Sequence, residues 1–351
     1  MSLVAILTDT HYGARKGAQY LHDYFEKFYS EVFFPTLKER GVETVLHLGD
    51  VFDSRKSIEY QALQWTKRVV LDPLKDYKVH AVVGNHDCYF KSTNKTNSPE
   101  LLLQDYENIQ TYSDPTEVTV NGEKILMLPW ICDENLEKTR KMMKSSKARF
   151  AMGHLELAGF EAYRGHKFED GKGLVQPSEF KKFEKVLSGH FHTRSDDGKI
   201  YYMGNPYEMY WNDVNDPRGF VLFDTETGEM EYVNNPNTLF SIVYYEDTKH
   251  QTFNASQYKN KIVKVVVRKK SKQKDFDKFL DKLFSTGLID LKVVENFNVQ
   301  EAEDFDASDV EENTLSILSR YVDESDFEES SLCSDQIKAL LSEIYMEACE
   351  V

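Results

Sequence analysis

Five short apolar runs in this sequence are each followed at once by residues of types that bind metal ions. The runs lie at residues 3–7, 45–48, 81–83, 150–153 and 186–189, and each has the length and composition of a buried strand. Turns after such strands face the edge of the sheet where α/β proteins place ligands and catalytic groups. We therefore expect seven side chains to meet at one site: Asp9, His11, Asp50, Asn85, His154, His190 and His192.

These seven side chains, called the strand-end residues below, offer a mixture of oxygen and nitrogen donor atoms. Such a set favours a pair of borderline divalent ions, such as manganese, iron or zinc, over calcium, which prefers oxygen donors. Paired ions lie roughly 3.5–4 Å apart and need a bridging ligand, for which the carboxylate of Asp50 is the natural choice. His47 and His80 also lie beside predicted strands, but single histidines there are more often packed or solvated, so we exclude both.

Length and composition indicate an unexported globular protein. The chain has 351 residues, of which 40% are hydrophobic, enough to bury a core. No apolar run approaches the roughly 18 residues of a membrane span, and the N-terminus lacks a secretory signal pattern. The four cysteines, Cys88, Cys132, Cys333 and Cys349, form no C-x-x-C pair, which argues against disulfides and a thiolate zinc site. We expect a cytoplasmic protein with no membrane association.

The formal net charge of −16 argues against a nucleic-acid partner only until its distribution is considered. Residues 301–351 hold 16 of the 59 acidic residues but two of the 43 basic ones. Residues 1–300 are therefore nearly neutral, and their acids include predicted metal ligands whose charge bound cations would offset. A polyanion could approach the site.

Residues 1–235 have the pattern of one α/β domain. Helices are predicted at 20–40 and 58–71, and a hairpin at 116–128 turns at Asn121-Gly122, a pair that suits a type I′ turn. The polar stretch 91–98 and the glycine-containing stretch 156–176 are predicted to be loops. Together the elements indicate a four-layer α/β/β/α sandwich with helices outside two facing sheets.

The rest of the chain is predicted to form a small module and a tail. Within 236–300, strands at 261–268 and 291–294 flank a helix at 274–284, which gives a βαβ cap module. Residues 301–313 are an acidic linker, and 314–351 contain two short amphipathic helices that need a surface to bury against, either a partner or the parent domain. The basic cluster Arg268, Lys269, Lys270 and Lys272 is equally consistent with a solvated loop and with a phosphate-contacting patch.

The turns also carry a family resemblance. They read Asp9-x-His11, Gly49-Asp50, Gly84-Asn85-His86-Asp87, Gly153-His154 and Gly189-His190-x-His192. In this order they resemble the five signature motifs of the calcineurin-like metallophosphoesterases, over about residues 3–210. Within that superfamily the chain is most similar to SbcD-type DNA repair nucleases, including those of T-even-like phages, because of the stretch 49–53, the polar loop, the cap module and the tail.

The resemblance implies a role for each site residue. One metal would be held by Asp9, His11, Asp50 and His192, and the other by Asp50, Asn85, His154 and His190. His86 would be the general acid, Gly84 would let the backbone turn, and Asp87 would orient His86 or brace the turn. Asp53 stands where many SbcD-type relatives have histidine, and Arg15, Lys16 and Lys91 are further candidates for DNA contact.

The implied function is a two-metal DNA nuclease in recombination or double-strand-break repair, with Mn²⁺ as the first choice of metal. A hydroxide between the metals would attack the phosphodiester of duplex ends, hairpins or single strands. The tail would bind an SMC-like ABC-type ATPase, and helices at 58–71 and 99–108 would form a nuclease homodimer in a two-plus-two complex. If the protein is phage-encoded, the cytoplasm is that of the host. The alternatives are a phosphoprotein phosphatase or cyclic-nucleotide phosphodiesterase of the same superfamily, and a non-catalytic scaffold.

Overall fold

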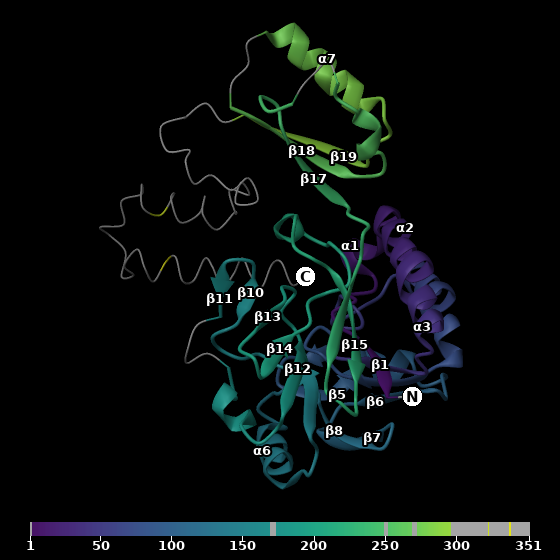
Figure 1. The fold of residues 1–351 in the computed structure, drawn as a ribbon, viewed down its shortest axis with the longest axis vertical. Coiled ribbons are helices and arrows are strands. Elements are labelled where there is room, and N and C mark those ends of the chain that lie inside the picture. The colour runs from purple at the N-terminus through teal and green to yellow at the C-terminus, as the bar shows by residue number, and fades with distance from the viewer. Residues whose placement is uncertain are drawn as a thin grey trace. The chain divides into compact units, whose positions relative to one another are not determined.

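The computed structural model describes residues 2–168, 173–248, 252–268 and 272–295, together with Val322 and Ile337. The chain divides into two compact units, Met1–Leu239 and a second that begins at Phe240 (Figure 1). The acidic linker at 301–313, the predicted tail helices, Lys269 and Lys270 lie outside the described residues, apart from the two single positions in the tail. In the described part of the chain, no helix is long and apolar enough to cross a membrane.

The first unit contains a six-stranded mixed sheet in the order β16-β15-β1-β2-β3-β6. The strands β1, β2, β3 and β6 are parallel, and β15 and β16 extend the sheet antiparallel beyond β1. The parallel arrangement brings the carboxyl ends of the first three strands to one edge. The bounds are β1 (Leu3–Leu7), β2 (Thr44–His47), β3 (Lys78–Val82), β6 (Ile109–Tyr112), β15 (Gly219–Asp224) and β16 (Met230–Asn234).

A second six-stranded sheet in the same unit has the order β13-β14-β12-β9-β8-β7. The neighbours β8, β9, β12 and β14 are parallel, and the register pairs His154 with Gly189, so β9 and β12 end side by side. The predicted hairpin is confirmed, with φ of 51° at Asn121 and 87° at Gly122. The bounds are β7 (Thr116–Val120), β8 (Glu123–Leu128), β9 (Phe150–His154), β12 (Lys185–Gly189), β13 (Ser195–Asp196) and β14 (Ile200–Tyr202).

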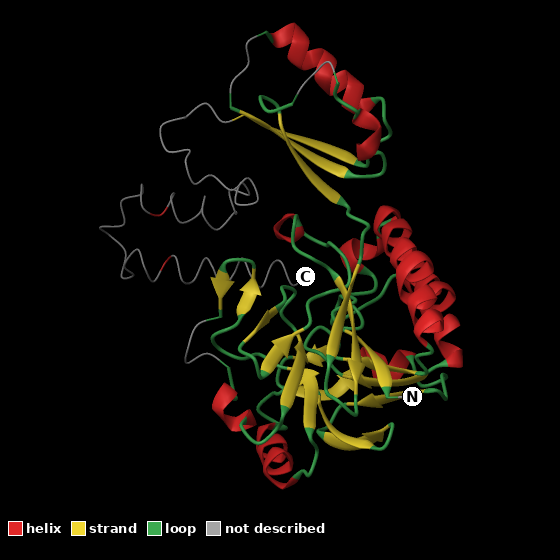
Figure 2. Ribbon diagram, in the orientation of Figure 1, coloured by secondary structure: helices red, strands yellow, loops and turns green. Residues whose placement is uncertain are grey.

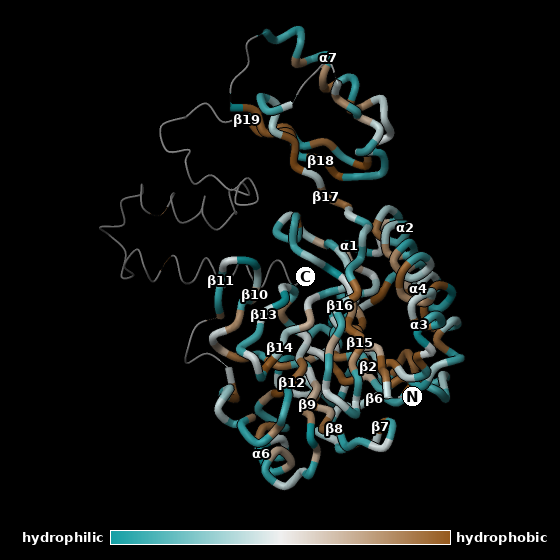
Figure 3. The backbone as a smooth tube through the Cα atoms, in the orientation of Figure 1, coloured by the Kyte–Doolittle hydropathy of each residue, from teal (hydrophilic) through white to brown (hydrophobic). Residues whose placement is uncertain are grey.

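The two sheets share one apolar core. Val4 and Leu46 of the first sheet cluster with Met127, Phe150 and Leu187 of the second, and all are buried. Figure 3 shows the hydrophobic backbone segments concentrated along such strands as β15 and β2. The other face of the second sheet packs against the helix α6 (Leu136–Ser145) in a separate cluster.

Helices cover the outer face of the first sheet (Figure 2). The predicted helix at 20–40 forms as α2 (Gln19–Lys27), the π-helical turn η1 (Phe28–Phe33) and α3 (Phe34–Arg40), with Gly41 left-handed at its end. Pro35 has no amide hydrogen, and the amide of Phe34 before it bonds Tyr29 in the wider π pattern. The remaining short helices are α1 (Ala14–Gly17), α4 (Tyr60–Thr66), η2 (Lys67–Leu71), η3 (Pro73–Asp76), α5 (Ser98–Leu102), η4 (Pro177–Phe180) and η5 (Trp211–Asp213).

Two predicted loops contain short hairpins. The stretch 91–98 belongs to a hairpin of β4 (Cys88–Phe90) and β5 (Thr93–Asn97), and the stretch 156–176 contains β10 (Glu161–Tyr163) and β11 (His166–Lys167). The polar sequence of β5 has no apolar alternation, which is why the loop prediction was wrong. The buried amide of Asn94 holds this hairpin instead, by donating to the carbonyl oxygens of Ser113 and Trp130 at 3.2 and 2.8 Å.

The second unit is a parallel three-stranded sheet in the order β17-β18-β19. The helix α7 (Gln273–Phe284) buries Phe276, Phe279 and Leu283 against valines of β18. The predicted strands and helix of the βαβ module are present, and β17 adds a strand that was not predicted. The bounds are β17 (Phe240–Tyr244), η6 (Ala255–Tyr258), β18 (Ile262–Val267) and β19 (Asp290–Glu295). Mixed parallel and antiparallel sheets with helices confirm the predicted α/β class.

Candidate metal centre

The strand-end residues converge, although two of them, His11 and His192, are 181 residues apart in sequence. Four of them have left-handed backbone, with φ of 50° at Asp9, 45° at His11, 53° at Asp50 and 88° at His190. Left-handed backbone is uncommon for residues other than glycine and costs on the order of 1–3 kcal/mol each. Such strain gathers where side chains must be aimed at one point.

One set of donor atoms comes from Asp9, His11 and His192, and these atoms lie within 4.8 Å of one another. The Nε2 atoms of the two histidines are 3.1 Å apart, and Nε2 of His192 is 3.9 Å from Oδ1 of Asp9. Oδ2 of Asp50 faces the same space, 3.7 Å from Nε2 of His11.

A second set comes from Asp50, His154 and His190. Oδ2 of Asp50 is 3.3 Å from Nε2 of His154. The side-chain oxygen of Asn85 lies between the two imidazoles, 2.8 Å from Nε2 of His154 and 3.0 Å from Nδ1 of His190. The same Asp50 oxygen therefore borders both sets, the position that a bridging ligand requires.

The electrostatics of the two sets fit divalent cations. Burial raises the pKa of Asp9, whereas the pKa of Asp50, which burial would raise, is held well below its usual range by His154. Burial would lower the pKa of both His11 and His154. Hydrogen bonding to Asp53 instead raises the pKa of His11 to about 9, and the charge of Asp50 raises the pKa of His154 to about 9. The buried carboxylates thus attract positive charge, and divalent ions can replace the protons on the imidazoles.

Neighbouring groups fix how the imidazoles point. Nδ1 of His154 is 2.8 Å from the carbonyl oxygen of Leu48, so it donates there and leaves Nε2 as the ligand atom. Nε2 of His190 lies 3.5 Å from the carboxylate of Glu156, which leaves Nδ1 for the centre. Glu156 was not predicted from the sequence, and neither was Trp130, whose ring is 5.2 Å from that of His190. Glu156 is two residues beyond His154, so the strand-end criterion could have found it.

His86 borders the first set and is half-buried. Its Nδ1 is 2.6 Å from the carbonyl oxygen of Asp53, and its backbone amide donates to Oδ1 of Asp50 at 2.8 Å. The carboxylate of Asp53 lies 3.4 Å from Nδ1 of His11. Donor atoms of His11, Asp53 and His86 form a further set, in which they lie within 4.8 Å of one another. Asp53 thus contacts both histidines, one by its backbone and one by its side chain.

Asp87 braces the turn. Its fully buried carboxylate accepts backbone hydrogen bonds from Val51 at 3.2 Å, Phe52 at 3.0 Å and Gly84 at 2.9 Å. These amides belong to two different strand-to-loop turns. The carboxylate therefore ties together the turn that follows Asp50 and the turn that carries His86.

The glycines of the motifs allow close approach between turns. Gly84 is not among the residues with left-handed backbone, so what its lack of a side chain provides is space and not a left-handed conformation. A Cβ atom at Gly84 would lie 2.2 Å from the amide nitrogen and from Oδ1 of Asp50, far inside van der Waals contact. A Cβ at Gly189 would likewise lie 1.9 Å from Oγ1 of Thr8, which donates to Asp9.

The basic residues predicted to contact DNA, as far as the structure describes them, belong to both units. Arg15 and Lys16 are exposed, both with left-handed backbone, and Arg15 donates to the carbonyl oxygen of Met209 at 3.4 Å. Lys91 is exposed in the turn of the β4–β5 hairpin. Arg268 and Lys272 belong to the second unit, where the Arg268 guanidinium lies 4.9 Å from the ring centre of Tyr244.

The excluded histidines have other partners. Nε2 of His47 is 3.0 Å from the hydroxyl of Thr10, and burial lowers the pKa of His47 to about 3. Nδ1 of His80 is 2.7 Å from the hydroxyl of Tyr112. Neither residue belongs to the donor sets found in the described part of the chain.

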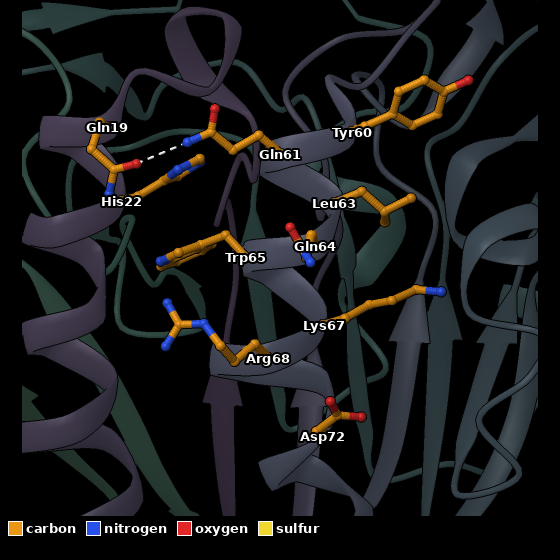
Figure 4. A pocket seen from close by; sticks show the side chains of 10 residues that line it. All are labelled: Gln19, His22, Tyr60, Gln61, Leu63, Gln64, Trp65, Lys67, Arg68 and Asp72. Carbon is orange, nitrogen blue, oxygen red and sulfur yellow. Dashed lines mark hydrogen bonds between the residues drawn. The ribbon is translucent and has the colours of Figure 1, made fainter.

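A cavity of about 880 Å³ lies between α2 and α4 (Figure 4). Both polar and apolar side chains line it, with a 3.0 Å hydrogen bond between Gln19 and Gln61, and His22 stacks on Trp65 with ring centres 4.7 Å apart. None of the strand-end residues lines it. The lining residues are Gln19, His22, Tyr60, Gln61, Leu63, Gln64, Trp65, Lys67, Arg68 and Asp72.

The chain is similar to a phage protein and to two solved structures. "Exonuclease subunit 1" of Enterobacteria phage T4 is 34% identical over 284 residues, which is 80% of each chain. Two solved structures are more distant: a dimetal phosphatase from Danio rerio (13% identity, 63% of this chain and 91% of that chain, TM-score 0.41) and nuclease MPE from Pseudomonas putida (16%, 66% and 87%, TM-score 0.32). Residues 2–194 match the calcineurin-like phosphoesterase family, and this span includes every strand-end residue. The chain belongs to the calcineurin-like phosphoesterases, which use divalent metal ions to hydrolyse phosphate esters.

Proposed function

We propose that this protein is a two-metal-dependent DNA nuclease that acts in recombination or double-strand-break repair. The observation that carries the proposal is the convergence of seven side chains with oxygen or nitrogen donor atoms into two groups, both of which Asp50 borders. The similarity to a phage protein named as an exonuclease subunit supports DNA as the substrate, whether duplex ends, hairpins or single strands.

In this proposal Asp9, His11, Asp50 and His192 hold one ion, and Asp50, Asn85, His154 and His190 hold the other. The mixture of imidazole, amide and carboxylate donors makes manganese our first choice. Two bound divalent ions supply charge neutralisation of a phosphodiester and activate water at neutral pH. The buried carboxylates and the fixed imidazoles hold that charge in place without rearrangement.

His86 is proposed as the general acid for the departing sugar oxygen. Its Nδ1 hydrogen is held by the carbonyl oxygen of Asp53, so the ring is oriented and Nε2 can deliver a proton. Proton transfer of this kind contributes typically ~10²–10⁴-fold to rate. The backbone amide of His86 also donates to Asp50, which places the ring at the edge of the ligand sets.

The test is degradation of end-labelled DNA by the purified chain with manganese or magnesium. His86→Ala should keep both metals, measured by calorimetric titration, and lose roughly 10²–10⁴-fold in turnover. Loss of metal binding in this variant would instead make His86 a ligand. Hydrolysis of phosphoprotein or cyclic nucleotide but not DNA would favour a different phosphoesterase activity. No metal uptake and no hydrolysis of any phosphodiester would favour a scaffold.

The partners and location extend the proposal. The phage relative is named as a subunit, and we propose that this chain also acts in a complex, with residues 314–351 bound to an SMC-like ABC-type ATPase. A homodimer through the helices α4 and α5 would give a complex with two copies of each chain. We place this complex in the cytoplasm, which is that of the host cell if the protein is phage-encoded. Tyr60 and Leu101 on these helices are 91% and 59% exposed, which leaves apolar surface for such a contact. Light scattering of the chain alone and with the ATPase tests both contacts.

A further inference from the structure

The segment 204–218, called the Tyr210 loop below, contains none of the strand-end residues but is attached to two of the turns that carry them. The hydroxyl of Tyr207 donates to the carbonyl oxygen of Thr10 at 2.5 Å, between Asp9 and His11. At the other turn, the amide of Asn205 donates to the carbonyl oxygen of His192 at 3.2 Å. The loop is therefore positioned by the metal-binding turns themselves.

A buried ion-pair network stiffens the same loop. Arg218 is 4% exposed, and its guanidinium donates to the carbonyl oxygen of His192 and to Oδ1 of Asn205 at 2.6 Å. It also pairs with the carboxylates of Asp213 at 2.9 Å and Asp216 at 2.8 Å. A buried charge is tolerated only with good partners, and here the partners join His192 to the loop.

The network fixes the backbone at Tyr210. Oδ2 of Asp213 accepts from the amides of Met209 at 2.6 Å and Tyr210 at 2.9 Å, and the amide of Asp213 donates back to Tyr210 at 3.1 Å. Arg15 also donates to the carbonyl oxygen of Met209, which places a cationic residue next to this backbone.

The side chain of Tyr210 is nevertheless open to solvent. It is 47% exposed, and its ring lies nearly parallel to that of His192, with a 20° angle between planes and 6.2 Å between ring centres. A large exposed aromatic ring on a rigid backbone beside a catalytic centre is the arrangement that stacks on a ligand's flat face.

We propose that Tyr210 is a substrate-contacting residue whose ring stacks on the nucleobase next to the phosphate being hydrolysed, with Asp213 and Arg218 holding it in position. This inference rests on the proposed nuclease function. Stacking uses the π-face that every base has, so it would position the substrate without selecting a sequence. Arg15, beside the same backbone, would contact the adjacent phosphate.

The experiment compares Tyr210→Ala and Tyr210→Phe with the wild-type chain on a single-stranded oligonucleotide and on copies with one abasic site moved along the cleaved region. Manganese is present throughout, and binding of each oligonucleotide is measured by fluorescence anisotropy in the His86→Ala background. The matched control is Tyr163→Ala, because Tyr163 is 46% exposed but stacks on His166, which belongs to no donor set described above.

We expect Tyr210→Ala to lower kcat/KM and binding by about 5- to 150-fold. Tyr210→Phe should stay near wild type, because a phenyl ring also stacks. At one position of the abasic site, Tyr210→Ala and the wild type should have equal kcat/KM and binding, because the base that stacks on the ring is missing there. The inference would be overturned if Tyr210→Ala lost the same factor in kcat/KM on every abasic substrate, or if Tyr210→Phe lost as much as Tyr210→Ala. A matching loss in Tyr163→Ala would overturn it as well. If the wild type cleaves DNA and Tyr210→Ala is unchanged, only this inference fails. If the wild type neither cleaves nor binds DNA, the nuclease proposal fails with it.

Discussion

Replacement of Asp87 by asparagine removes one of the two oxygens that tie the metal-binding turns together. In its best orientation the amide oxygen would keep the bonds to Val51 and Gly84, which both use Oδ2. The new NH₂ group would then face the amide of Phe52, which now donates to Oδ1 at 3.0 Å. The charge-assisted hydrogen bond from Phe52 is lost, and the side-chain NH₂ group and the Phe52 amide then face each other as two donors without an acceptor.

The magnitude follows from these contacts. A hydrogen bond to a charged group contributes about 1.5–3 kcal/mol, and a buried donor without an acceptor costs about 1–3 kcal/mol. Relaxation offsets part of the sum, so we expect a loss of about 2–4 kcal/mol in the free energy of unfolding. Because the same turns carry Asp50 and His86, manganese affinity should also fall about 10- to 100-fold.

Urea unfolding and calorimetric titration with manganese measure the two effects. The matched control is Asp72→Asn, which removes an exposed carboxylate paired with Lys75 at 2.7 Å and should leave the urea midpoint close to that of the wild type, because exposed ion pairs contribute little. If Asp87→Asn unfolds at the wild-type urea concentration and binds manganese with wild-type affinity, the Asp87 carboxylate does not tie the two turns together.

Three further predictions concern the same centre. In Gly84→Ala the new Cβ would displace Asp50, so calorimetric titration should detect no manganese binding while circular dichroism shows a folded chain. Unaltered binding would contradict the close approach of Asp50 to Gly84. His11 and His154 have pKa values raised from 6.5 to about 9, so the stability they give the metal-free protein is fully present below pH 6.5 and lost as pH rises through about 9. Manganese must displace these protons, so its affinity should rise over the same window, and a flat titration series from pH 6.5 to 9 would argue against it. Arg218→Met should lose about 3–5 kcal/mol of stability in thermal unfolding, since its acidic partners remain buried without a cation, and wild-type unfolding would show that the network contributes little.

The sequence was most informative where one physical pattern repeats. Each apolar run ends in a turn, and parallel strands bring such turns together, so the meeting of His154 with His190 could be predicted without knowing the register. The hairpin at Asn121 was predictable because its turn requires two residues that tolerate positive φ.

Other features depend on contacts between distant residues and leave no local pattern. The strand β5 is held by the side chain of Asn94, not by apolar alternation. Gly84 matters because Asp50 approaches it, which only the assembled turns reveal. Tyr210 and Arg218 lie beyond the last motif and reach the centre through a buried ion pair, so no spacing rule selects them.

The pairing of β1 has a consequence for the timing of synthesis. The strand that leads to Asp9 and His11 is flanked by β2 on one side and by β15 on the other, with Leu3 paired to Asp224. His11 must also wait for His192, which is 181 residues later. At a translation rate of ~5–20 residues per second, this delay is roughly 10 to 40 seconds. The centre therefore cannot assemble before residue 192 has been synthesised, and any hydrolysis at this centre must wait until most of the first unit, Met1–Leu239, has been made.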